Sequence, residues 1–424
     1  ILQAAFFKLA NVIPLEQAVA EMKEAIYKTY YKKKGQAVVD MNNASIEHGI
    51  NELVEVAIPA AWADAKDAPV ERKAPDFIRE VVDVMNRQEG DSLPVSIMKK
   101  YGLEDGTWHA GSTKYEKRGA AVDVPQWDMT KCIQCNQCAL VCPHAAIRPV
   151  LLLVFVQQHA PAGFETKKAN GAELGKYQYR MQVSPYDCTG CGSCVNVCPA
   201  KTKALKMAPL AEVEKVENDN WNFAMDLPTL DLPVNKATVK GSQFLQPMFE
   251  FSGACAGCGE TPYVKLVTQL FGDRMIVANA TGCSSIYGGS APTCPYTVNK
   301  QGHGPAWANS LFEDNAEFGF GMNLATTHRR ERLADLIRQL AEGCGDEVKA
   351  ICNAWLENKD DAEGSRKAAP AVVKMAEECM NCGCECDEIC KEIYDLRDLL
   401  VKKSQWIFGG DGWAYDIGYG GLDH

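Results

Sequence analysis

The stretch KCIQCNQCALVCP, residues 131–143, separates its four cysteines by two, two and three residues and places proline directly after the last. A second copy, DCTGCGSCVNVCP, occupies residues 187–199, so the pattern repeats 56 residues further on, from Cys132 to Cys188. Thiolate sulfur is a soft ligand that suits iron–sulfur clusters. The two runs therefore predict a pair of [4Fe–4S] clusters.

The expected ligand sets cross between the two runs. In ferredoxins with this spacing, the cysteine before the proline ligates the other cluster. One set is Cys132, Cys135, Cys138 and Cys198, and the other is Cys188, Cys191, Cys194 and Cys142. Structural zinc is the alternative, but zinc sites usually draw four ligands from two separated CxxC pairs. Two four-cysteine runs that each end in CP do not match that habit.

The composition narrows the class of protein. The chain has 424 residues, 19 cysteines, 46% hydrophobic residues and a net charge of −11. An acidic chain without a basic patch is not expected to bind nucleic acid. No apolar run reaches the roughly 18 residues of a membrane span, and the most apolar stretch, 149–158, predicts a buried strand. No export leader is visible, and the chain opens at Ile1 without methionine, so either its start was removed or it is part of a longer polypeptide.

Two segments before the cysteine runs have their own patterns. Residues 14–34 predict an amphipathic helix that starts at Pro14 and stops before Gly35. The following stretch, 36–43, predicts a short strand or loop. Residues 66–120 carry prolines, charges and little periodicity, which predicts a connector that wraps over neighbouring domains.

After residue 240 the sequence alternates between helix and strand patterns. A helix is expected with Thr261 as N-cap and Gly272 after its end, followed by a strand at MIVANA, 275–280. This rhythm predicts an α/β domain with its site at the carboxyl ends of the strands. Three loop cysteines, Cys255, Cys258 and Cys283, are candidate ligands of a third cluster that lacks a fourth ligand. The alternative for Cys283 is a small buried residue in a tight turn.

A second candidate site lies in QWIFGGDGWAYDIGYGG, residues 405–421. The pattern predicts a strand, a glycine turn and the start of a helix. An acidic residue between glycines after a strand suits Mg²⁺, and such a turn lets backbone N–H groups approach a diphosphate. Asp411 is the candidate Mg²⁺ ligand. A GDG motif alone is a weak signal, because glycine turns after strands are common.

The motifs taken together resemble the pyruvate:ferredoxin oxidoreductases. The resemblance rests on the double CxxCxxCxxxCP, CAGCGE, ATGCSS and GDGWAYDIG, and it covers essentially the whole chain. It implies that Cys255, Cys258 and Cys283 bind the cluster nearest thiamine diphosphate, with Glu260 and Cys283 beside that cofactor. It also implies that Gly410, Asp411, Gly412 and Trp413 form the loop that holds the diphosphate and Mg²⁺.

The implied fold class is multidomain α/β, with a ferredoxin-like 2[4Fe–4S] α+β domain inserted before an α/β thiamine diphosphate domain. The expected domains are the end of an α/β domain related to transketolase C-terminal domains (1–67), a linker domain (68–118), the ferredoxin-like domain (119–228) and the first part of the thiamine diphosphate domain (229–424). In the family, the fourth ligand of the third cluster lies past His424 and the substrate contacts precede Ile1. The chain is therefore expected to be an interior piece that does not turn over alone.

The resemblance implies oxidative decarboxylation of pyruvate with coenzyme A, three [4Fe–4S] clusters, thiamine diphosphate and Mg²⁺. The expected electron acceptor is ferredoxin or flavodoxin, and the expected enzyme is a cytoplasmic homodimer with no membrane or nucleic-acid partner. Two alternatives remain. One is the same reaction on another 2-oxoacid. The other is a non-catalytic electron-transfer subunit, in which the Asp411 site would hold no cofactor.

A cysteine-rich segment, EECMNCGCECDEICKEIYD at 377–395, has no counterpart in this resemblance. Its cysteines are Cys379, Cys382, Cys384, Cys386 and Cys390, with Cys344 and Cys352 upstream. An additional metal site on one helix face is one hypothesis, and a helix that happens to be rich in cysteine is the other.

Overall fold

The computed structural model describes residues 1–64, 73–380, 386–416 and 419. The chain forms two compact units, Ile1–Lys73 and Ala74–His424, which are treated separately below. Within the described residues, no helix combines the length and apolar character needed to cross a membrane.

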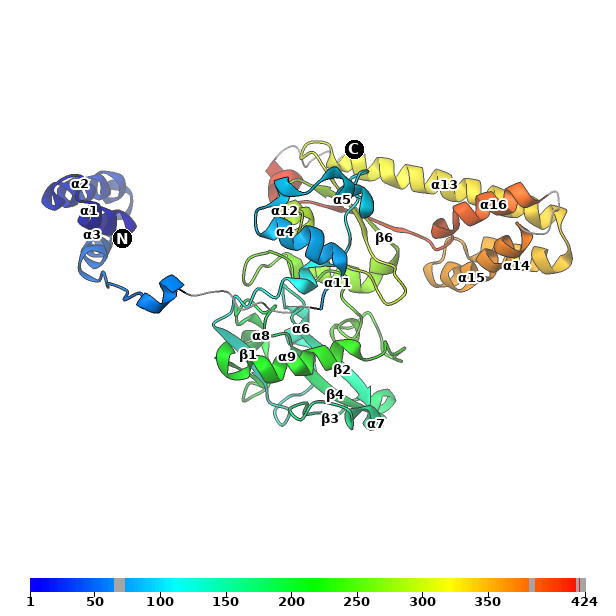
Figure 1. Cartoon of the computed structure of the whole chain (residues 1–424), viewed down its shortest axis with the longest axis horizontal. Coiled ribbons are helices and arrows are strands. Elements are labelled where there is room, and N and C mark those ends of the chain that lie inside the picture. The colour runs from blue at the N-terminus through cyan, green and yellow to red at the C-terminus, as the bar shows by residue number, and fades with distance from the viewer. Residues whose placement is uncertain (65–72, 381–385, 417–418, 420–424) are drawn as a thin grey trace. The chain divides into compact units, whose positions relative to one another are not determined.

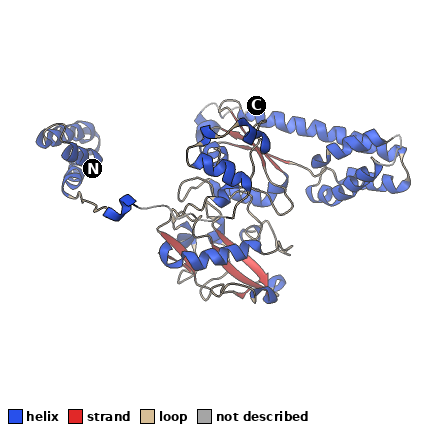
Figure 2. Cartoon of the chain, viewed as in Figure 1, coloured by secondary structure: helices blue, strands red, loops and turns tan. Residues whose placement is uncertain are grey.

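The first unit is helical (Figures 1 and 2). Its elements are α1 (Leu2–Ala10), α2 (Leu15–Lys34), α3 (Gln36–Asn51) and the 3-10 helix η1 (Ala60–Asp64). Helix α2 confirms the helix expected at 14–34, and Gly35 after it has a left-handed φ of 78°. The strand or loop expected at 36–43 is wrong, because α3 covers it. Val39 and Ile46, two turns apart on α3, are buried where α3 packs on α1 and α2, so tertiary packing outweighs the local β preference of VV. The domain type expected for 1–67 stays a prediction.

The second unit opens with a segment of short helices, and the connector role expected for it stays a prediction. Its elements are η2 (Ile78–Val82), α4 (Asp83–Asn86), η3 (Gly90–Ser92), α5 (Val95–Lys100) and η4 (Ser112–Tyr115). The Ser112 hydroxyl donates to the Pro292 carbonyl at 2.7 Å, and the Thr113 hydroxyl donates to the Glu250 carbonyl at 2.8 Å. The segment is therefore hydrogen-bonded to the part of the chain after residue 240, called the third region below.

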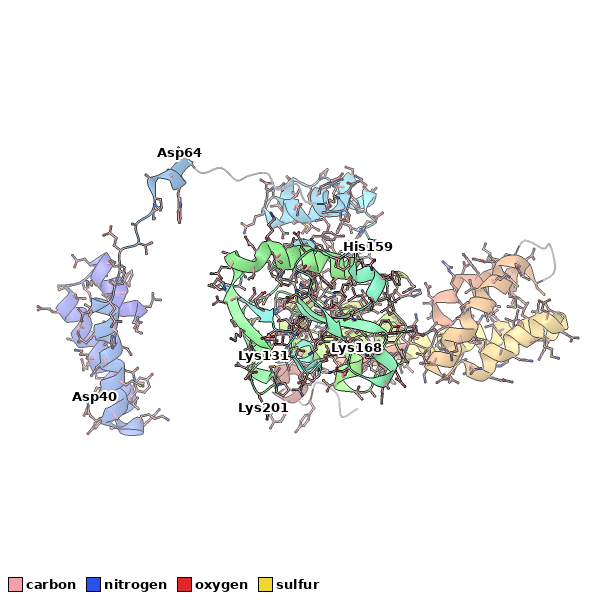
Figure 3. The ribbon with its side chains drawn as sticks, turned by 90° about the horizontal axis from the view of Figure 1, so that it is seen from below. Asp40, Asp64, Lys131, His159, Lys168 and Lys201 are labelled. Atoms are coloured by element: carbon pink, nitrogen blue, oxygen red, sulfur yellow. The ribbon has the colours of Figure 1, made fainter. Side chains whose placement is uncertain are left out.

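A ferredoxin-like domain with two small antiparallel sheets follows (Figure 3, where Lys131 and Lys168 are labelled). Strands β1 (Asp123–Trp127) and β5 (Leu205–Pro209) pair, and β2 (Ile147–Leu153), β4 (Tyr177–Val183) and β3 (Lys167–Lys168) form the order β2-β4-β3. Its helices are α6 (Gln137–Leu140), α7 (Val154–Gln157), η5 (Ala172–Leu174), α8 (Ser193–Val197) and α9 (Leu210–Asp226). Strand β2 confirms the buried strand expected at 149–158 only as far as Leu153, because Val154–Gln157 form α7, in which Val154 and Phe155 are exposed. Each cysteine run precedes one strand. Cys138 lies in α6 and Cys194 in α8, and the other six cysteines of the runs lie outside helices and strands.

The third region contains a parallel three-stranded sheet in the order β7-β6-β8. Its elements are α10 (Val239–Ser242), α11 (Thr261–Phe271), η6 (Gly272–Arg274), β6 (Met275–Ala280), α12 (Cys283–Gly289), β7 (Ala306–Ser310), β8 (Ser404–Phe408) and the π-helix η8 (Gly412–Asp416). The expected strand MIVANA is confirmed as β6. Helix α11 ends before Gly272 as expected, but it starts one residue earlier than expected, at Thr261, with Glu260 as its N-cap.

Among the described residues between β7 and β8, which exclude 381–385, four helices are inserted. They are α13 (Asn315–Gly343), α14 (Asp346–Asn358), α15 (Ala362–Cys379) and α16 (Asp387–Asp395), followed by η7 (Arg397–Leu399). The first part of α13 packs on β6 and β8, and its last part contributes Leu333, Leu336, Ile337 and Leu340 to a separate core around Trp355. Figure 1 shows α13 running from the sheet to α14, α15 and α16. The sequence had not predicted this bundle.

Candidate metal centres and the loops around them

The two cysteine runs share one backbone conformation. Gln134 and Asn136 have left-handed φ values of 60° and 62°, and the corresponding Gly190 and Gly192 have 69° and 73°. Glycine adopts this region freely, whereas other residues adopt it at a cost. The repeat in the sequence is therefore also a repeat in the turn that presents the thiols.

Hydrogen bonds to sulfur occur at the same place in both runs. The Gln134 N–H lies 3.4 Å from Cys132 Sγ, and the Gly190 N–H lies 3.4 Å from Cys188 Sγ. The Ala204 N–H approaches Cys198 Sγ at 3.4 Å. Hydrogen bonds to the sulfurs are among the features that set the reduction potential of an iron–sulfur cluster.

Side-chain hydrogen bonds hold the first run in its left-handed turns. Gln134, 1% exposed, donates to the Lys168 carbonyl at 2.8 Å and accepts from the Asn170 N–H at 2.7 Å. Asn136, also 1% exposed, donates to the Lys240 carbonyl at 2.9 Å and accepts from the Tyr179 hydroxyl at 2.9 Å. These bonds offset the backbone strain of the positive φ values at Gln134 and Asn136. In the second run, glycines adopt similar φ values without that strain.

One cavity gathers cysteines from both runs. It encloses about 380 Å³, counting the part open to solvent. Its lining includes Cys142, Cys188, Cys191 and Cys194, which are the four members of the second predicted ligand set. Four soft sulfur donors around one hollow fit an iron–sulfur cluster chemically. The ligand assignment itself stays a prediction.

The other thiols of the first run lie beside this group. Burial raises the pKa of Cys138, with smaller contributions from Cys194 and then from Cys132 and Cys135. The two groups of thiols therefore adjoin at Cys138 and Cys194. Cys198, the fourth member expected for the first set, is half-buried.

The thiols of Cys188 and Cys194 favour the protonated form when no metal is bound. Burial raises the pKa of Cys188 to about 12 and also raises that of Cys194. Since thiolates are the ligands, cluster assembly must displace these protons. Across the residues that the structure describes, no three His, Cys, Asp or Glu side chains are arranged to hold a single metal ion.

The CAGC loop lies against the second cysteine run. Gly257 has a left-handed φ of 73°, and a Cβ at this position would lie 3.7 Å from Cys191 Cβ. Cys255 is exposed and Cys258 is half-buried. The third candidate ligand, Cys283, is also exposed and starts α12 after β6. The structure thus places the CAGC loop beside the thiols of the second cysteine run. That Cys255, Cys258 and Cys283 together bind a third cluster stays a prediction.

His144 connects the end of the first cysteine run to the segment before the CAGC loop, and it was missed by the sequence reasoning. It is 2% exposed, and its Nε2 lies 2.9 Å from the Ala254 carbonyl oxygen. Its own carbonyl accepts from the Phe251 N–H at 3.0 Å. Burial lowers the pKa of His144, so the imidazole is neutral and Nε2–H donates to Ala254. His144, two residues after Cys142, is therefore hydrogen-bonded to Ala254, one residue before Cys255.

The parallel sheet brings two other candidate loops to one edge. Strand β6 lies between β7 and β8, and the Cys283 turn follows β6 while the Asp411 turn follows β8. Since the strands are parallel, both turns lie at their carboxyl ends, where open α/β sheets bind ligands. The Asn315 amide donates to the Phe408 carbonyl at 3.0 Å, which fixes the end of β8.

The GDG loop leaves room at its glycines. Asp411 is exposed, and a Cβ at Gly410 would meet nothing within 4 Å. At Gly412 a Cβ would reach Phe312 at 3.6 Å. Trp413 is 3% exposed, and its indole N–H has no hydrogen-bond partner in the described part of the chain. An exposed carboxylate between open glycines suits a metal-bound diphosphate.

Buried tyrosine hydroxyls lie close to Glu260. The Tyr296 hydroxyl makes no hydrogen bond to any described residue, and the Tyr287 hydroxyl lies beside the Glu260 carboxylate. Burial, and then the Glu260 carboxylate, raise the pKa of Tyr287. Unpaired buried polar groups are costly and are commonly satisfied by a bound group or by water. This surrounding therefore fits a polar cofactor.

The cysteine-rich segment is only partly described. Cys382 and Cys384 lie outside the described residues. Cys344 Sγ and Cys386 Sγ are 3.5 Å apart, and Cys352 and Cys390 are fully buried in the helical bundle. The hypothesis of a further metal site stays open.

Comparisons with known proteins cover the whole chain. Residues 131–202 match the family described as 4Fe-4S dicluster domain, residues 329–375 match the pyruvate-ferredoxin oxidoreductase insertion domain, and residues 63–121 match EKR, a domain of unknown function. The dicluster match and the two small sheets together establish the ferredoxin-like 4Fe–4S domain within a mixed α/β protein.

Individual relatives match from end to end of this chain. The chain is 56% identical over 428 residues to the pyruvate:ferredoxin oxidoreductase of Moorella thermoacetica. It is 53% and 51% identical to the pyruvate-flavodoxin oxidoreductases of Enterobacter agglomerans and Klebsiella pneumoniae. All of this chain is covered in each case, and it spans 36% of the length of each relative.

Proposed function

Because the whole chain corresponds to a section of the pyruvate:ferredoxin and pyruvate-flavodoxin oxidoreductases, we propose that it serves the oxidative decarboxylation of pyruvate to acetyl-CoA and CO₂. In this proposal it supplies the electron path and part of the thiamine diphosphate site. Electrons leave to ferredoxin or flavodoxin. The proposal also includes a homodimeric enzyme in the reducing cytoplasm, where sixteen or more thiolate ligands per dimer stay reduced, since each dicluster uses eight cysteines.

The observation that carries the proposal is the position of the CAGC loop. Its Gly257 lies against Cys191, and Cys191 lines the cavity of the second ligand set. That set adjoins the first at Cys138 and Cys194. A third cluster on Cys255, Cys258 and Cys283 would therefore open a continuous sulfur-lined route through both sets.

Two loops would hold the organic cofactor. The open glycines Gly410 and Gly412 would let backbone N–H groups approach the diphosphate, with Asp411 on the Mg²⁺. Glu260 and Cys283 would lie beside the cofactor, and Trp413 would belong to the loop that holds the diphosphate and Mg²⁺, as the resemblance implies. When bound, thiamine diphosphate supplies the electron sink for the carbanion left by loss of CO₂.

The chain's own residues then have distinct tasks. The cysteine turns hold the one-electron centres at fixed spacing, and the buried neutral His144 keeps the CAGC segment on the dicluster. Asn315 fixes the end of β8 from which the GDG turn departs. Such positioning matters because small displacements of reacting groups slow enzymes severely.

The test is an anaerobic exposure of the holoenzyme to pyruvate and coenzyme A, followed by EPR. We expect an organic radical together with reduced [4Fe–4S] clusters. Asp411→Ala should keep the dicluster iron but lose the radical and bind Mg²⁺–thiamine diphosphate at least tenfold more weakly. An EPR radical signal with a different 2-oxoacid and none with pyruvate would identify that other 2-oxoacid as the substrate. Full dicluster reduction by a carrier, with no cofactor bound at Asp411, would instead support an electron-transfer subunit.

A further inference from the structure

Lys265 is a buried lysine whose ammonium group enters the ferredoxin-like domain. It lies on α11, the helix that starts directly after the CAGCGE sequence, and is 2% exposed. Its Nζ donates to three carbonyl oxygens, those of Ala139, Leu140 at 3.0 Å and Cys142 at 3.2 Å. The ammonium is therefore enclosed by the turn that joins the last two cysteines of the first run.

No carboxylate balances this charge in the described part of the chain. Lys265 takes part in no ion pair there, and all three of its acceptors are neutral. A buried charge without a counter-charge costs several kcal/mol. Burial lowers the pKa of Lys265 to about 8, and the neighbouring groups that act on it most are Cys142, then the cation Arg148 and then Cys138. The carbonyls satisfy its donors but leave its charge unbalanced.

The two neighbouring cysteines belong to different predicted ligand sets. Cys138 is in the first set, and Cys142 lines the cavity of the second. A cluster held by four thiolates carries net negative charge, and reduction adds one more negative charge. A cation in a water-poor site close to both clusters would stabilise the reduced form of each, which raises their reduction potentials.

We propose that Lys265 is a positioning and charge-balancing residue that raises the reduction potentials of the two dicluster clusters. The inference rests on the proposed function, because it requires both clusters. The higher reduction potentials would favour electron transfer to the dicluster from a cluster at the CAGC loop. The same three hydrogen bonds fasten α11, and with it the start of that loop, to the dicluster turn.

The test compares four forms of the holoenzyme: wild type, Lys265→Gln, Lys265→Arg and Lys240→Gln. The Gln variant removes the charge and keeps an N–H donor, whereas the Arg variant keeps the charge. Lys240 is the matched control, because it lies near Cys132 and Cys135 but is half-exposed, so that water screens its charge. Iron content and an EPR-monitored redox titration are measured for each form.

For Lys265→Gln we expect the reduced-to-oxidised ratio of the dicluster to fall on the order of tenfold at fixed solution potential, equivalent to about 59 mV. Lys240→Gln should shift this ratio much less, and Lys265→Arg should stay close to wild type. A Gln variant with full iron and wild-type midpoints would overturn the proposal and leave Lys265 a packing residue.

Loss of iron would also be decisive. If Lys265→Gln loses clusters that Lys265→Arg retains, the charge itself is needed to hold them, which supports the proposal. Equal loss in both variants overturns it, because shape rather than charge would then explain the effect. Wild-type protein without dicluster signals would instead contradict the proposed function.

Discussion

Gly257 and Cys191 are in contact across the boundary between the CAGC loop and the second cysteine run, with only 3.7 Å between a Cβ placed on Gly257 and Cys191 Cβ. The left-handed φ of Gly257, 73°, permits this approach. A Cβ would fit at this distance, so glycine is favoured here by its positive φ, which other residues avoid.

Gly257→Val tests whether this contact matters for electron flow. A β-branched residue at positive φ is strained by about 1–2 kcal/mol and would push the loop away from Cys191. We expect reduction of the dicluster by pyruvate to slow on the order of tenfold or more, while CO₂ release with an artificial acceptor is better preserved. Stopped-flow absorbance of the clusters measures the first rate.

Gly259→Ala is the matched control. A Cβ at Gly259 meets nothing within 4 Å, and this glycine has no positive φ. Its reduction rate should equal that of wild type. Equal slowing in both variants would mean that the loop tolerates no substitution and that the contact with Cys191 has no special role.

Crossed ligation can be tested by combining cysteine substitutions. Cys142 lines the cavity with Cys188, Cys191 and Cys194, so Cys142→Ser and Cys188→Ser should impair the same cluster. The double variant should then lose no more iron than Cys188→Ser alone, about four atoms per chain. Cys142→Ser combined with Cys132→Ser should lose about twice as much.

The opposite pattern would show that each run holds its own cluster. In that case Cys142→Ser with Cys132→Ser would lose only about four irons, and Cys142→Ser with Cys188→Ser would lose about eight. Iron and sulfide analysis of anaerobically purified protein distinguishes the two patterns, and far-UV circular dichroism controls for unfolding.

Local signals in the sequence sufficed for parts of the structure. The cysteine spacing, the apolar run of β6 and the Pro and Gly that bound α2 and α11 each act within a few residues. Helix α3 was missed because Val38 and Val39 favour a strand locally, whereas burial of Val39 and Ile46 depends on two other helices.

The site was predicted less completely for the same reason. Cysteines, glycines and Asp411 carry a recognisable spacing, so their loops were found. His144 and Lys265 act through carbonyls 110 and more than 120 residues away, and no local pattern marks such partners. The only hint was the position of His144 directly after a CP pair, which has no equivalent in the second run.

Arg148 joins the ferredoxin-like domain to the third region by a buried ion pair with Glu250. Their side chains are 13% and 9% exposed, and the guanidinium also lies 5.1 Å from the Trp221 ring. Arg148→Met would leave the Glu250 carboxylate uncompensated. We expect the free energy of unfolding to fall by about 3–5 kcal/mol, measured by denaturant unfolding of the holoenzyme.

Arg332→Met provides the comparison for that result. Arg332 pairs with Glu392 at 2.8 Å, but the two side chains are 54% and 42% exposed. Its loss should cost less than about 1 kcal/mol. Similar losses for both substitutions would contradict the role assigned to the buried pair.

The thiols of Cys344 and Cys386 are close enough to be joined chemically. Their sulfurs lie 3.5 Å apart between α13 and α16. Treatment with a small-molecule disulfide should link them, each thiol losing a proton while the reagent is cleaved to two thiols. Peptide mass spectrometry should find the linked pair, and Cys344→Ser should abolish it. A dominant link from Cys344 to another cysteine would contradict this packing.

One continuous helix, α13, belongs to two cores at once. Its first residues pack on β6 and β8, and its last residues pack in the core of the bundle with α14, α15 and α16. The core of the bundle is therefore built on α13 and not on the strands. Changes at the far end of the bundle should leave the order of the strands in the sheet unchanged. The turn between α14 and α15 is a poor place to cut, because its Lys359 and Asp360 carbonyls accept hydrogen bonds from Arg330 of α13 and from Lys402 just before β8.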